Sequence, residues 1–390
     1  MATVILNRKT PDRTVLGHPW IYRTEIDRIE GEYKPGDIVD VIDKNKRFIG
    51  KGYINLKSMI SIRLLTRKDE KIDEEFFRKR ISDAWEYRKK VMDDLNSCRI
   101  IYGESDFLPA LVVDKFGDYL VAQFLSLGMD IRKDMIVTLL EEIIKPKGIF
   151  ERDDVPVREI EGLEQKKGYL RGFFEPIQVF TENNLRFYVD IQNGQKTGYF
   201  LDQKENRVSI AKYVKGARVL DCFCHTGSFA VHAAHYGAKE ITAVDISDDA
   251  LAMAEKNARL NSLEDRISFV CANVFDLLRQ YVSQGKSYDV VILDPPAFTK
   301  SKNTVDSAIK GYKEINLRAL KLINPGGFLI TASCSQHISP ELFRNVILDA
   351  AVDAKRCIRL VEERSQAKDH PILPGVPETR YLKFLIFQVL

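Results

Sequence analysis

Residues 217–229 have the sequence Ala217-Arg218-Val219-Leu220-Asp221-Cys222-Phe223-Cys224-His225-Thr226-Gly227-Ser228-Phe229. The apolar start of this stretch predicts a strand over 217–223, and the residues after Gly227 predict a helix over 228–236. The alternation continues toward the C-terminus, with a second helix over 248–261. Further strands are predicted at 239–245, 267–271, 288–293, 327–333, 357–364 and 381–389. Strands that alternate with helices of this length predict an α/β fold with a doubly wound, mostly parallel sheet.

Acidic or polar residues stand at the ends of the first three of these strands. They are Asp221, Asp245 and Asn273. Ligands bind at the carboxyl ends of parallel strands, but only Gly227 falls in the first loop, which argues against a dinucleotide fingerprint. The set suits S-adenosylmethionine, which has an amino-acid end and no phosphate. The candidate cofactor contacts at these strand ends are Asp221, Phe223, Thr226, Gly227, Ser228, Asp245, Ile246, Asn273, Asp276 and Asp294.

The run Cys222-Phe223-Cys224-His225 invites a metal interpretation, which its spacing does not support. Zinc sites usually pair such residues at another spacing, and no second Cys pair occurs in the chain. No metal is expected. Cys222 is instead expected to pack beneath the cofactor.

The predicted strand 288–293 ends in Asp294-Pro295-Pro296-Ala297-Phe298. Two successive prolines fix a rigid turn without backbone donors. Such a turn can present Asp294 and its carbonyl groups to a flat substrate, with Phe298 available for stacking. The same turn suits enzymes that methylate an exocyclic nitrogen of a base, so methylation of a guanine or another base nitrogen is an alternative.

Cys334 follows the predicted strand 327–333 and shares the crevice with Asp294. Carbon 5 of cytosine is a poor nucleophile, but a thiolate that adds to C6 makes the ring enamine-like, so that C5 can attack a methyl sulfonium. This covalent catalysis divides one hard step into two easier ones. It needs a thiol of lowered pKa and a proton donor at N3, a role for a protonated Asp294. The alternative is that Cys334 is a small buried residue at a strand end.

The first 190 residues follow different patterns. Short β-branched and aromatic runs at 4–6, 38–42, 48–53 and 60–65 predict a small barrel of about five strands over residues 1–70. Residues 71–190 are predicted to form an α+β domain, with helices over 70–95 and 131–144 and a hairpin over 111–124. The methyl-donor pocket then belongs to a third domain, 191–390.

The first 70 residues hold 14 Lys and Arg against 10 Asp and Glu, so they are more basic than the whole chain. Basic and aromatic residues alternate near the N-terminus, which suits contact with an RNA backbone and stacking on its bases. An ordinary solvated face of the barrel is the alternative. With Phe298, the candidate RNA-binding residues are Arg8, Lys9, Arg13, Trp20, Tyr22 and Arg23. A base must leave its stack to reach the crevice, so single-stranded or loop RNA is the expected substrate.

Together these motifs resemble the RlmI-type ribosomal RNA large-subunit methyltransferases, which form 5-methylcytidine in 23S rRNA with S-adenosylmethionine. The resemblance covers essentially the whole chain. Besides the loops quoted above, it includes residues 17–22, 103–114, 195–207, 333–335 and 367–371. It implies a PUA-like RNA-binding domain at 1–70, the middle domain at 71–190 and a class I, Rossmann-like methyltransferase domain at 191–390.

The resemblance also implies roles for single residues. Cys334 becomes the nucleophile, and the donor pocket is lined by Asp221, Asp245, Asn273 and Asp294. The segment 195–207 is implied to close over the amino-acid end of the donor, with Gln203 and Arg207 as candidates. Related 5-methylcytosine enzymes often carry a second cysteine after the paired prolines, but here Ala297 stands there. The base that removes the C5 proton stays open, and Asp369-His370-Pro371 is either catalytic or, more in keeping with its position, a structural loop.

Composition sets the limits of these interpretations. The 390 residues carry a net charge of +3, with 45% hydrophobic and 29% charged residues, which excludes disordered and collagen-like classes. No apolar run approaches the ~20 residues of a membrane helix, and no secretory signal is recognisable. Six cysteines are too few for a disulfide framework, so a cytoplasmic protein with reduced thiols is expected.

The expected partners are 23S rRNA or a large-subunit assembly particle, with no membrane. Fold analogy allows a homodimer through a C-terminal edge strand. A third functional alternative is an RNA-binding assembly factor that has lost catalysis, against which the intact donor loop and Cys334 argue.

Overall fold

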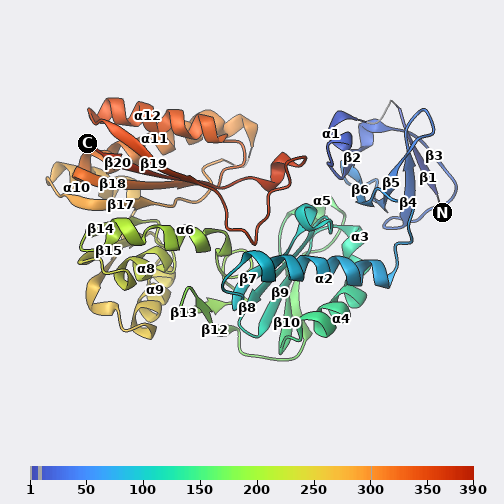
Figure 1. Cartoon of the computed structure of the whole chain (residues 1–390), viewed down its shortest axis with the longest axis horizontal. Coiled ribbons are helices and arrows are strands. Elements are labelled where there is room, and N and C mark those ends of the chain that lie inside the picture. Colours follow the sequence, from blue (N-terminus) through green and yellow to red (C-terminus); the bar gives the residue numbers. More distant parts are fainter. Residues whose placement is uncertain (1, 8–10, 300) are drawn as a thin grey trace. The chain divides into compact units, whose positions relative to one another are not determined.

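A computed structural model describes residues 2–7, 11–299 and 301–390 (Figure 1). The chain forms two compact units. One unit holds the residues up to Thr181 together with Val189–Leu201 and Lys368–Thr379, and the other holds Glu182–Tyr188, Asp202–Ala367 and Arg380–Leu390. The division into three domains at 70 and 190 stays a prediction. Within the described ranges, no helix has both the length and the apolar character needed to cross a membrane.

The second unit is built on a seven-stranded sheet with the strand order β16-β15-β14-β17-β18-β20-β19. Its strands are β14 (Arg218–Cys222), β15 (Glu240–Asp245), β16 (Ile267–Cys271), β17 (Tyr288–Leu293), β18 (Ile323–Ser333), β19 (Ile358–Arg364) and β20 (Lys383–Val389). The first five strands are parallel, and β20 runs antiparallel to both β18 and β19. The predicted doubly wound α/β fold is confirmed.

Helices cover both faces of this sheet, as Figure 1 shows. One layer contains α8 (Ser228–His235) and α9 (Asp248–Leu260), with the short helices α6 (Lys204–Ser209) and α7 (Ala211–Val214). The other contains α10 (Val274–Ser283), α11 (Val305–Leu322) and α12 (Pro340–Ala354). Ser247, Asn273 and Ser339 cap the N-termini of α9, α10 and α12 by accepting a hydrogen bond from a backbone N–H of the first turn. Because both faces are covered, the central strands are almost continuously apolar.

A six-stranded sheet follows the order β2-β6-β5-β4-β1-β3 in the N-terminal part of the first unit. Its strands are β1 (Thr3–Leu6), β2 (Trp20–Tyr22), β3 (Ile26–Glu30), β4 (Ile38–Ile42), β5 (Phe48–Ile54) and β6 (Ile60–Thr66), and a short helix, α1 (Asp12–Val15), precedes β2. The four predicted strands are present, and two were not predicted. The missed strands are the edges of the sheet: β2 has only three residues, and three of the five residues of β3 are charged and exposed.

The middle segment places helices against a five-stranded sheet of order β11-β10-β9-β8-β7. Its helices are α2 (Glu74–Val91), α3 (Leu127–Asp130), α4 (Lys133–Ile144) and α5 (Val157–Ile160). Its strands are β7 (Ser97–Tyr102), β8 (Leu111–Phe116), β9 (Tyr119–Phe124), β10 (Gly148–Asp153) and β11 (Lys166–Arg171), followed by the separate pair β12 (Ile177–Glu182) and β13 (Leu185–Asp190). The predicted hairpin is the β8–β9 pair, whose turn is Gly117-Asp118 with Gly117 at φ +59°.

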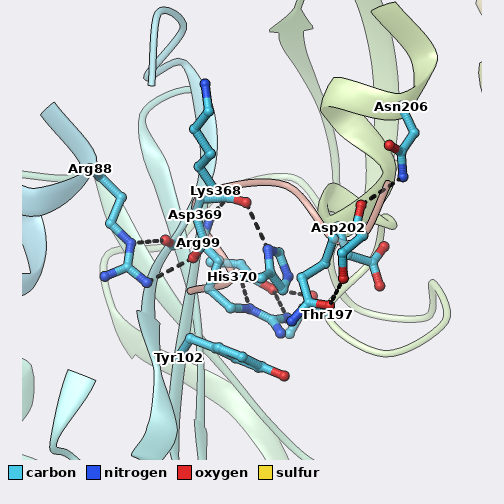
Figure 2. Close-up of polar contacts among 12 residues, drawn as sticks. Arg88, Arg99, Tyr102, Thr197, Asp202, Asn206, Lys368, Asp369 and His370 are labelled. Carbon is cyan, nitrogen blue, oxygen red and sulfur yellow. Dashed lines mark hydrogen bonds and ion pairs between the residues drawn. The ribbon is translucent and has the colours of Figure 1, made fainter. Parts of the chain in front are cut away.

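Helix α2 buries a charged residue on the face where its apolar spacing places the core. Arg88 has no exposed surface, and its guanidinium pairs with both carboxylate oxygens of Asp106, with Nη2 2.8 Å from Oδ2. It also donates to the carbonyl of Arg99 at 2.7 Å and to that of Asp369 at 2.7 Å (Figure 2). A buried guanidinium must have such partners, because an unpaired buried charge is strongly destabilising.

Asp369 and His370 lie in a segment of the first unit, Lys368–Thr379, that Arg88 anchors to β7. The Asp369 carboxylate accepts from the backbone N–H of Arg99 at 2.9 Å and lies 2.7 Å from Nδ1 of His370. Both side chains are buried, and the His370 ring lies 5.3 Å from the ring of Tyr102 (Figure 2). These contacts support the structural alternative for Asp369-His370-Pro371.

The Arg88–Asp106 pair predicts a large loss of stability on neutralisation. We expect Asp106→Asn to lower the free energy of unfolding of the first unit by about 3 kcal/mol, because it leaves a buried guanidinium without its counterion. Urea unfolding followed by tryptophan fluorescence measures this unit alone, since Trp20 and Trp85 are the only tryptophans and both belong to it. Asp83→Asn, which removes the exposed partner of Lys79 on the same helix, is the matched control and should leave unfolding unchanged. Equal effects of the two substitutions would contradict the prediction.

Candidate functional site

Asp221 stands at the carboxyl end of the central strand β14 and is only 1% exposed. Among the described residues, neither of its carboxylate oxygens has a hydrogen-bond partner. Burial, followed by the nearby Asp294 carboxylate, raises the pKa of Asp221 well above its ordinary value. A buried carboxyl group without partners is costly in a finished protein, so its position indicates a missing cationic ligand.

The loop after Asp221 is wound tightly enough to require left-handed backbone. Phe223, His225 and Gly227 have φ values of +63°, +49° and +78°. At Gly227, which precedes α8, a Cβ atom would lie 2.8 Å from the Cβ of Ala254. The loop therefore passes α9 closely and directs backbone toward the strand ends, where a ligand of an open α/β sheet docks.

Asp245 ends β15 beside this loop. Its Oδ2 accepts from the backbone N–H of His225 at 2.8 Å, and its Oδ1 accepts from that of Ser247 at 3.0 Å. Each carboxylate oxygen has a second acceptor position. These two bonds fix the carboxylate while leaving acceptor capacity for ribose hydroxyls.

Asn257 was not among the predicted site residues. Fully buried on α9, it donates to the carbonyl of Thr226 at 2.9 Å and accepts from the backbone N–H of Tyr188 at 2.8 Å. It thereby holds the donor loop in place, and within the part of the chain that the structure describes the buried Thr226 hydroxyl has no hydrogen-bond partner. Ser228, the first residue of α8, is also buried. An asparagine on the otherwise apolar face of 248–261 was the signal available in the sequence.

The remaining predicted cofactor contacts near β15 and β16 are more open. Ile246 is exposed, with 69% of its surface accessible. Asn273 caps α10 by accepting from the backbone N–H of Phe275 at 2.9 Å. Asp276 is exposed and lies 3.4 Å from Arg279. An apolar surface residue beside polar caps suits the edge of an adenosine, which stacks on one face and forms hydrogen bonds at its rim.

Asp294 follows β17 next to Asp221. Its Oδ1 accepts from Nε2 of Gln203 at 2.9 Å, and Oε1 of Gln203 accepts from Asn206 at 2.7 Å. Arg207 is buried and forms a pair with both oxygens of Glu182, at 2.8 and 3.0 Å. The structure thus joins Gln203 to the predicted pocket directly, and the positive charge of Arg207, which is paired with Glu182, acts on Asp221 by lowering the pKa of that carboxyl.

Cys334 follows β18 and is half-buried, with its Sγ 3.9 Å from the carbonyl oxygen of Pro295. Both neighbouring serines are fully buried. Ser333 donates to the hydroxyl of Tyr312 at 3.0 Å, and Ser335 shares a hydrogen bond of 2.9 Å with the same hydroxyl. The thiol is therefore held rigidly against the Asp294-Pro295-Pro296 turn.

Phe298, predicted to stack on a base, packs within the same unit. Its ring centroid lies 4.6 Å from that of Tyr312, 5.9 Å from that of Phe275 and 6.4 Å from that of Phe223. The side chain is only half-buried. It therefore supports the turn with one part of the ring and leaves another part accessible.

The predicted RNA-binding residues of the N-terminal sheet have mixed surroundings. Arg8 and Lys9 lie outside the described residues. Arg13 pairs with Glu25 and lies over the ring of Tyr22, and the indole of Trp20 donates to Glu104 at 2.9 Å. Arg23 is exposed. Their role in RNA binding stays a prediction.

The residues at the strand ends fit S-adenosylmethionine. The orphaned carboxyl of Asp221 can receive the ammonium group of its amino-acid end, and Asp245 can accept from the ribose hydroxyls. The close passage at Gly227 leaves no room for a larger residue. S-adenosylmethionine has no phosphate, so the loop needs no phosphate-binding arrangement, which agrees with its having only one glycine, Gly227.

Comparisons with known proteins agree with this geometry. Residues 168–388 match the family of S-adenosylmethionine-dependent methyltransferases, and residues 4–67 match the PUA-like domain family. A ribosomal RNA large subunit methyltransferase I from Tolumonas auensis is 39% identical over 100% of both chains. Its counterpart from Klebsiella pneumoniae (strain 342) is 41% identical over 94% of this chain and 93% of its own. The chain belongs to this methyltransferase family.

Solved structures support the fold of this methyltransferase. SMU.776, a putative methyltransferase complexed with SAH, superposes with a TM-score of 0.84 over 99% of both chains at 20% identity. At that identity the likeness concerns the fold alone. The family match covers more than half of the chain, so S-adenosylmethionine is its cofactor and a PUA-like domain precedes the catalytic one.

The unpaired carboxyl of Asp221 predicts that cofactor binding releases a proton. A bound ammonium group favours the ionised carboxylate, whereas the free protein favours the neutral acid, so affinity should rise with pH until Asp221 is ionised without ligand. Titration calorimetry in buffers of different ionisation enthalpy measures the released proton. Asp221→Asn should weaken binding at least tenfold, about 1.4 kcal/mol, and abolish proton release. Asp265→Asn, an exposed residue of the same unit, should change neither. Unchanged proton release in Asp221→Asn would contradict the assignment.

Proposed function

We propose that this methyltransferase methylates C5 of a cytidine in the RNA of the large ribosomal subunit through a covalent adduct between Cys334 and C6 of the base. The observation that carries the proposal is the Cys334 thiol, held against the Asp294-Pro295-Pro296 turn at the end of the strand next to it. The substrate class follows from the relatives of 39–41% identity, which are named ribosomal RNA large subunit methyltransferases I.

Within this proposal the chain's residues act in a fixed order. The Cys334 thiolate forms a C–S bond at C6, and the electron pair of the C5–C6 double bond becomes available at C5. Asp294 donates a proton to N3, which neutralises the charge that would build up on the ring. Bound S-adenosylmethionine supplies the electrophilic methyl group for C5. Loss of the C5 proton, cleavage of the C–S bond and return of the N3 proton to Asp294 then restore the aromatic ring, the thiolate and the protonated acid.

The donor pocket in this proposal consists of Asp221, Asp245, Asn273 and Asp294 around the loop Phe223–Ser228, with Gln203 holding Asp294. Phe298 offers the accessible part of its ring to the flipped base. Arg13, Trp20, Tyr22 and Arg23 of the PUA-like domain contact the RNA. The substrate would be 23S rRNA or a large-subunit particle in the cytoplasm. A homodimer through the edge strand β19 belongs to the same proposal.

Cys334→Ala tests the covalent step. We expect it to abolish methyl transfer while S-adenosylmethionine binding stays within a factor of two, because the thiol contacts the base and not the donor. Mass spectrometry of digested rRNA identifies the product, and methylguanosine in place of 5-methylcytidine would support the base-nitrogen alternative. Cys357→Ala, which removes an exposed cysteine, should retain full activity.

Trapping of the protein on a modified RNA is an independent test for the covalent adduct. RNA that contains 5-fluorocytidine cannot lose a C5 proton, so the wild-type protein should remain attached to it and migrate as a larger species under denaturing conditions. Cys334→Ala should form no such species. Full methylation by Cys334→Ala, or trapping without Cys334, would overturn the mechanism.

The exposed Arg23 predicts a purely electrostatic contribution to RNA affinity. A lysine or arginine that contacts one phosphate contributes about one unit to the slope of log K against log salt. We therefore expect Arg23→Ala to reduce that slope by about one for rRNA fragments, measured by filter binding at several salt concentrations. Arg28→Ala, whose guanidinium is already paired with Asp27 at 2.9 Å and Glu30 at 3.0 Å, is the control and should leave the slope unchanged. An equal slope for Arg23→Ala and the wild type would show that Arg23 does not contact the RNA backbone.

A further inference from the structure

Lys383 is a buried lysine beside the candidate nucleophile. It is the first residue of β20, lies opposite Ser333 of β18, and is 4% exposed. Its Nζ donates to the carbonyl oxygen of Ser335 at 2.7 Å and to that of Tyr381 at 2.7 Å. Because Ser335 directly follows Cys334, these bonds hold the amino group at the strand end that carries the thiol.

This amino group has no carboxylate partner within residues 2–7, 11–299 and 301–390. Two other buried cations of the described residues do have one: Arg88 pairs with Asp106, and Arg207 with Glu182. A buried ammonium group that meets only neutral carbonyls is expensive to keep charged. A purely structural position would be filled more stably by an apolar residue, as in the rest of β20, whose residues 384–387 are all buried and apolar.

The charges around Lys383 come from few groups. Burial lowers the pKa of Lys383 to about 8, a Cys334 thiolate raises it, and Arg380 lowers it. Burial also raises the pKa of Tyr312, which faces Cys334 from α11 and stays neutral. Among these groups, Cys334 is the one that can supply a negative charge to Lys383 near neutral pH.

We propose that Lys383 is the positioning residue that takes the proton of Cys334 and holds the resulting thiolate ready for attack. In this step the S–H bond of Cys334 breaks and an N–H bond forms on the neutral amine of Lys383. The net charge of the pair does not change, so no external base is needed. Lys383 acts through Cys334 and not on the base. The pairing rests on the proposed function only for the identity of the attacked atom, cytosine C6.

The reactivity of Cys334 toward iodoacetamide tests this pairing without RNA. The thiolate is the reactive form, so the pH at which alkylation of the Cys334 peptide reaches half its maximal rate reports the apparent pKa of the pair. We expect a midpoint below the ordinary ~8.5 of a thiol in the wild type. Lys383→Met should raise it by at least one pH unit, which slows alkylation at pH 7 about tenfold. Lys383→Arg cannot take the proton, because a guanidinium stays charged, but it keeps a cation that stabilises the thiolate, so its midpoint should stay near that of the wild type.

Lys321→Met removes an exposed lysine of the same unit and serves as the matched control, with S-adenosylmethionine binding as the test of folding. An unchanged midpoint in a folded Lys383→Met protein would overturn the proposal. If Lys383→Met does not bind the cofactor, the alkylation midpoint of the wild type decides. A wild-type midpoint at or above ~8.5 overturns the pairing of Lys383 with Cys334. A lower wild-type midpoint, with the midpoint of Lys383→Arg close to it, supports the pairing. Because no RNA is present, these outcomes are independent of whether the product in rRNA is 5-methylcytidine.

Discussion

The parallel register of β14, β15, β17 and β18 is the constraint on which the site depends. In this register Cys222 lies opposite both Val244 and Leu293, and Leu293 lies opposite Thr331, so the four strands end close to one line. Neighbouring strands are about 4.8 Å apart. Short side chains that leave these ends, such as Asp221, Asp294 and Cys334, therefore become neighbours without any long reach. A shift of one residue in the register of any of these strands would point its functional side chain toward one of the helix layers that cover the sheet.

Within that geometry, structural and functional residues differ in whether their buried ionisable groups have partners. Buried guanidinium groups are paired with carboxylates, as Arg63 is with Glu161 and Arg88 with Asp106. Among the described residues, Asp221 lacks any hydrogen-bond partner and Lys383 meets only carbonyl oxygens. Folding would be more favourable with apolar residues at these two positions, because a buried carboxyl group without a partner and a buried amino group that meets only carbonyl oxygens are both costly. Both residues lie beside the carboxyl ends of the strands, Asp221 on the side of the methyl donor and Lys383 on the side of the thiol. The residues that lower the stability of the fold are therefore at the site where a bound ligand or a thiolate can compensate for them.

The sequence indicates the parts of this arrangement that depend on local pattern. Strand ends marked by Asp221, Asp245 and Asp294 are predictable, because an apolar run followed by an acid has few structural explanations. Edge strands β2 and β3 are not, since their short or half-polar patterns are equally compatible with loops. Arg88 and Lys383 are harder still. Each occupies a position that periodicity assigns to the core, and its partners, Asp106 and Asp369 for one and Ser335 for the other, come from elements that only the fold brings near.

The six cysteines show why the surroundings of a thiol decide its chemistry. Cys222 and Cys224 lie closest to the donor loop, but burial raises the pKa of both thiols well above the ordinary value, so they stay protonated. Cys98 is fully buried in the first unit, and Cys271 and Cys357 are exposed on the surface of the second. Cys334 alone is partly exposed, lies between two buried serines that are hydrogen-bonded, and has the buried amine of Lys383 beside it. A thiolate needs both access to a substrate and a compensating positive charge, and of these six positions only the end of β18 offers the two together.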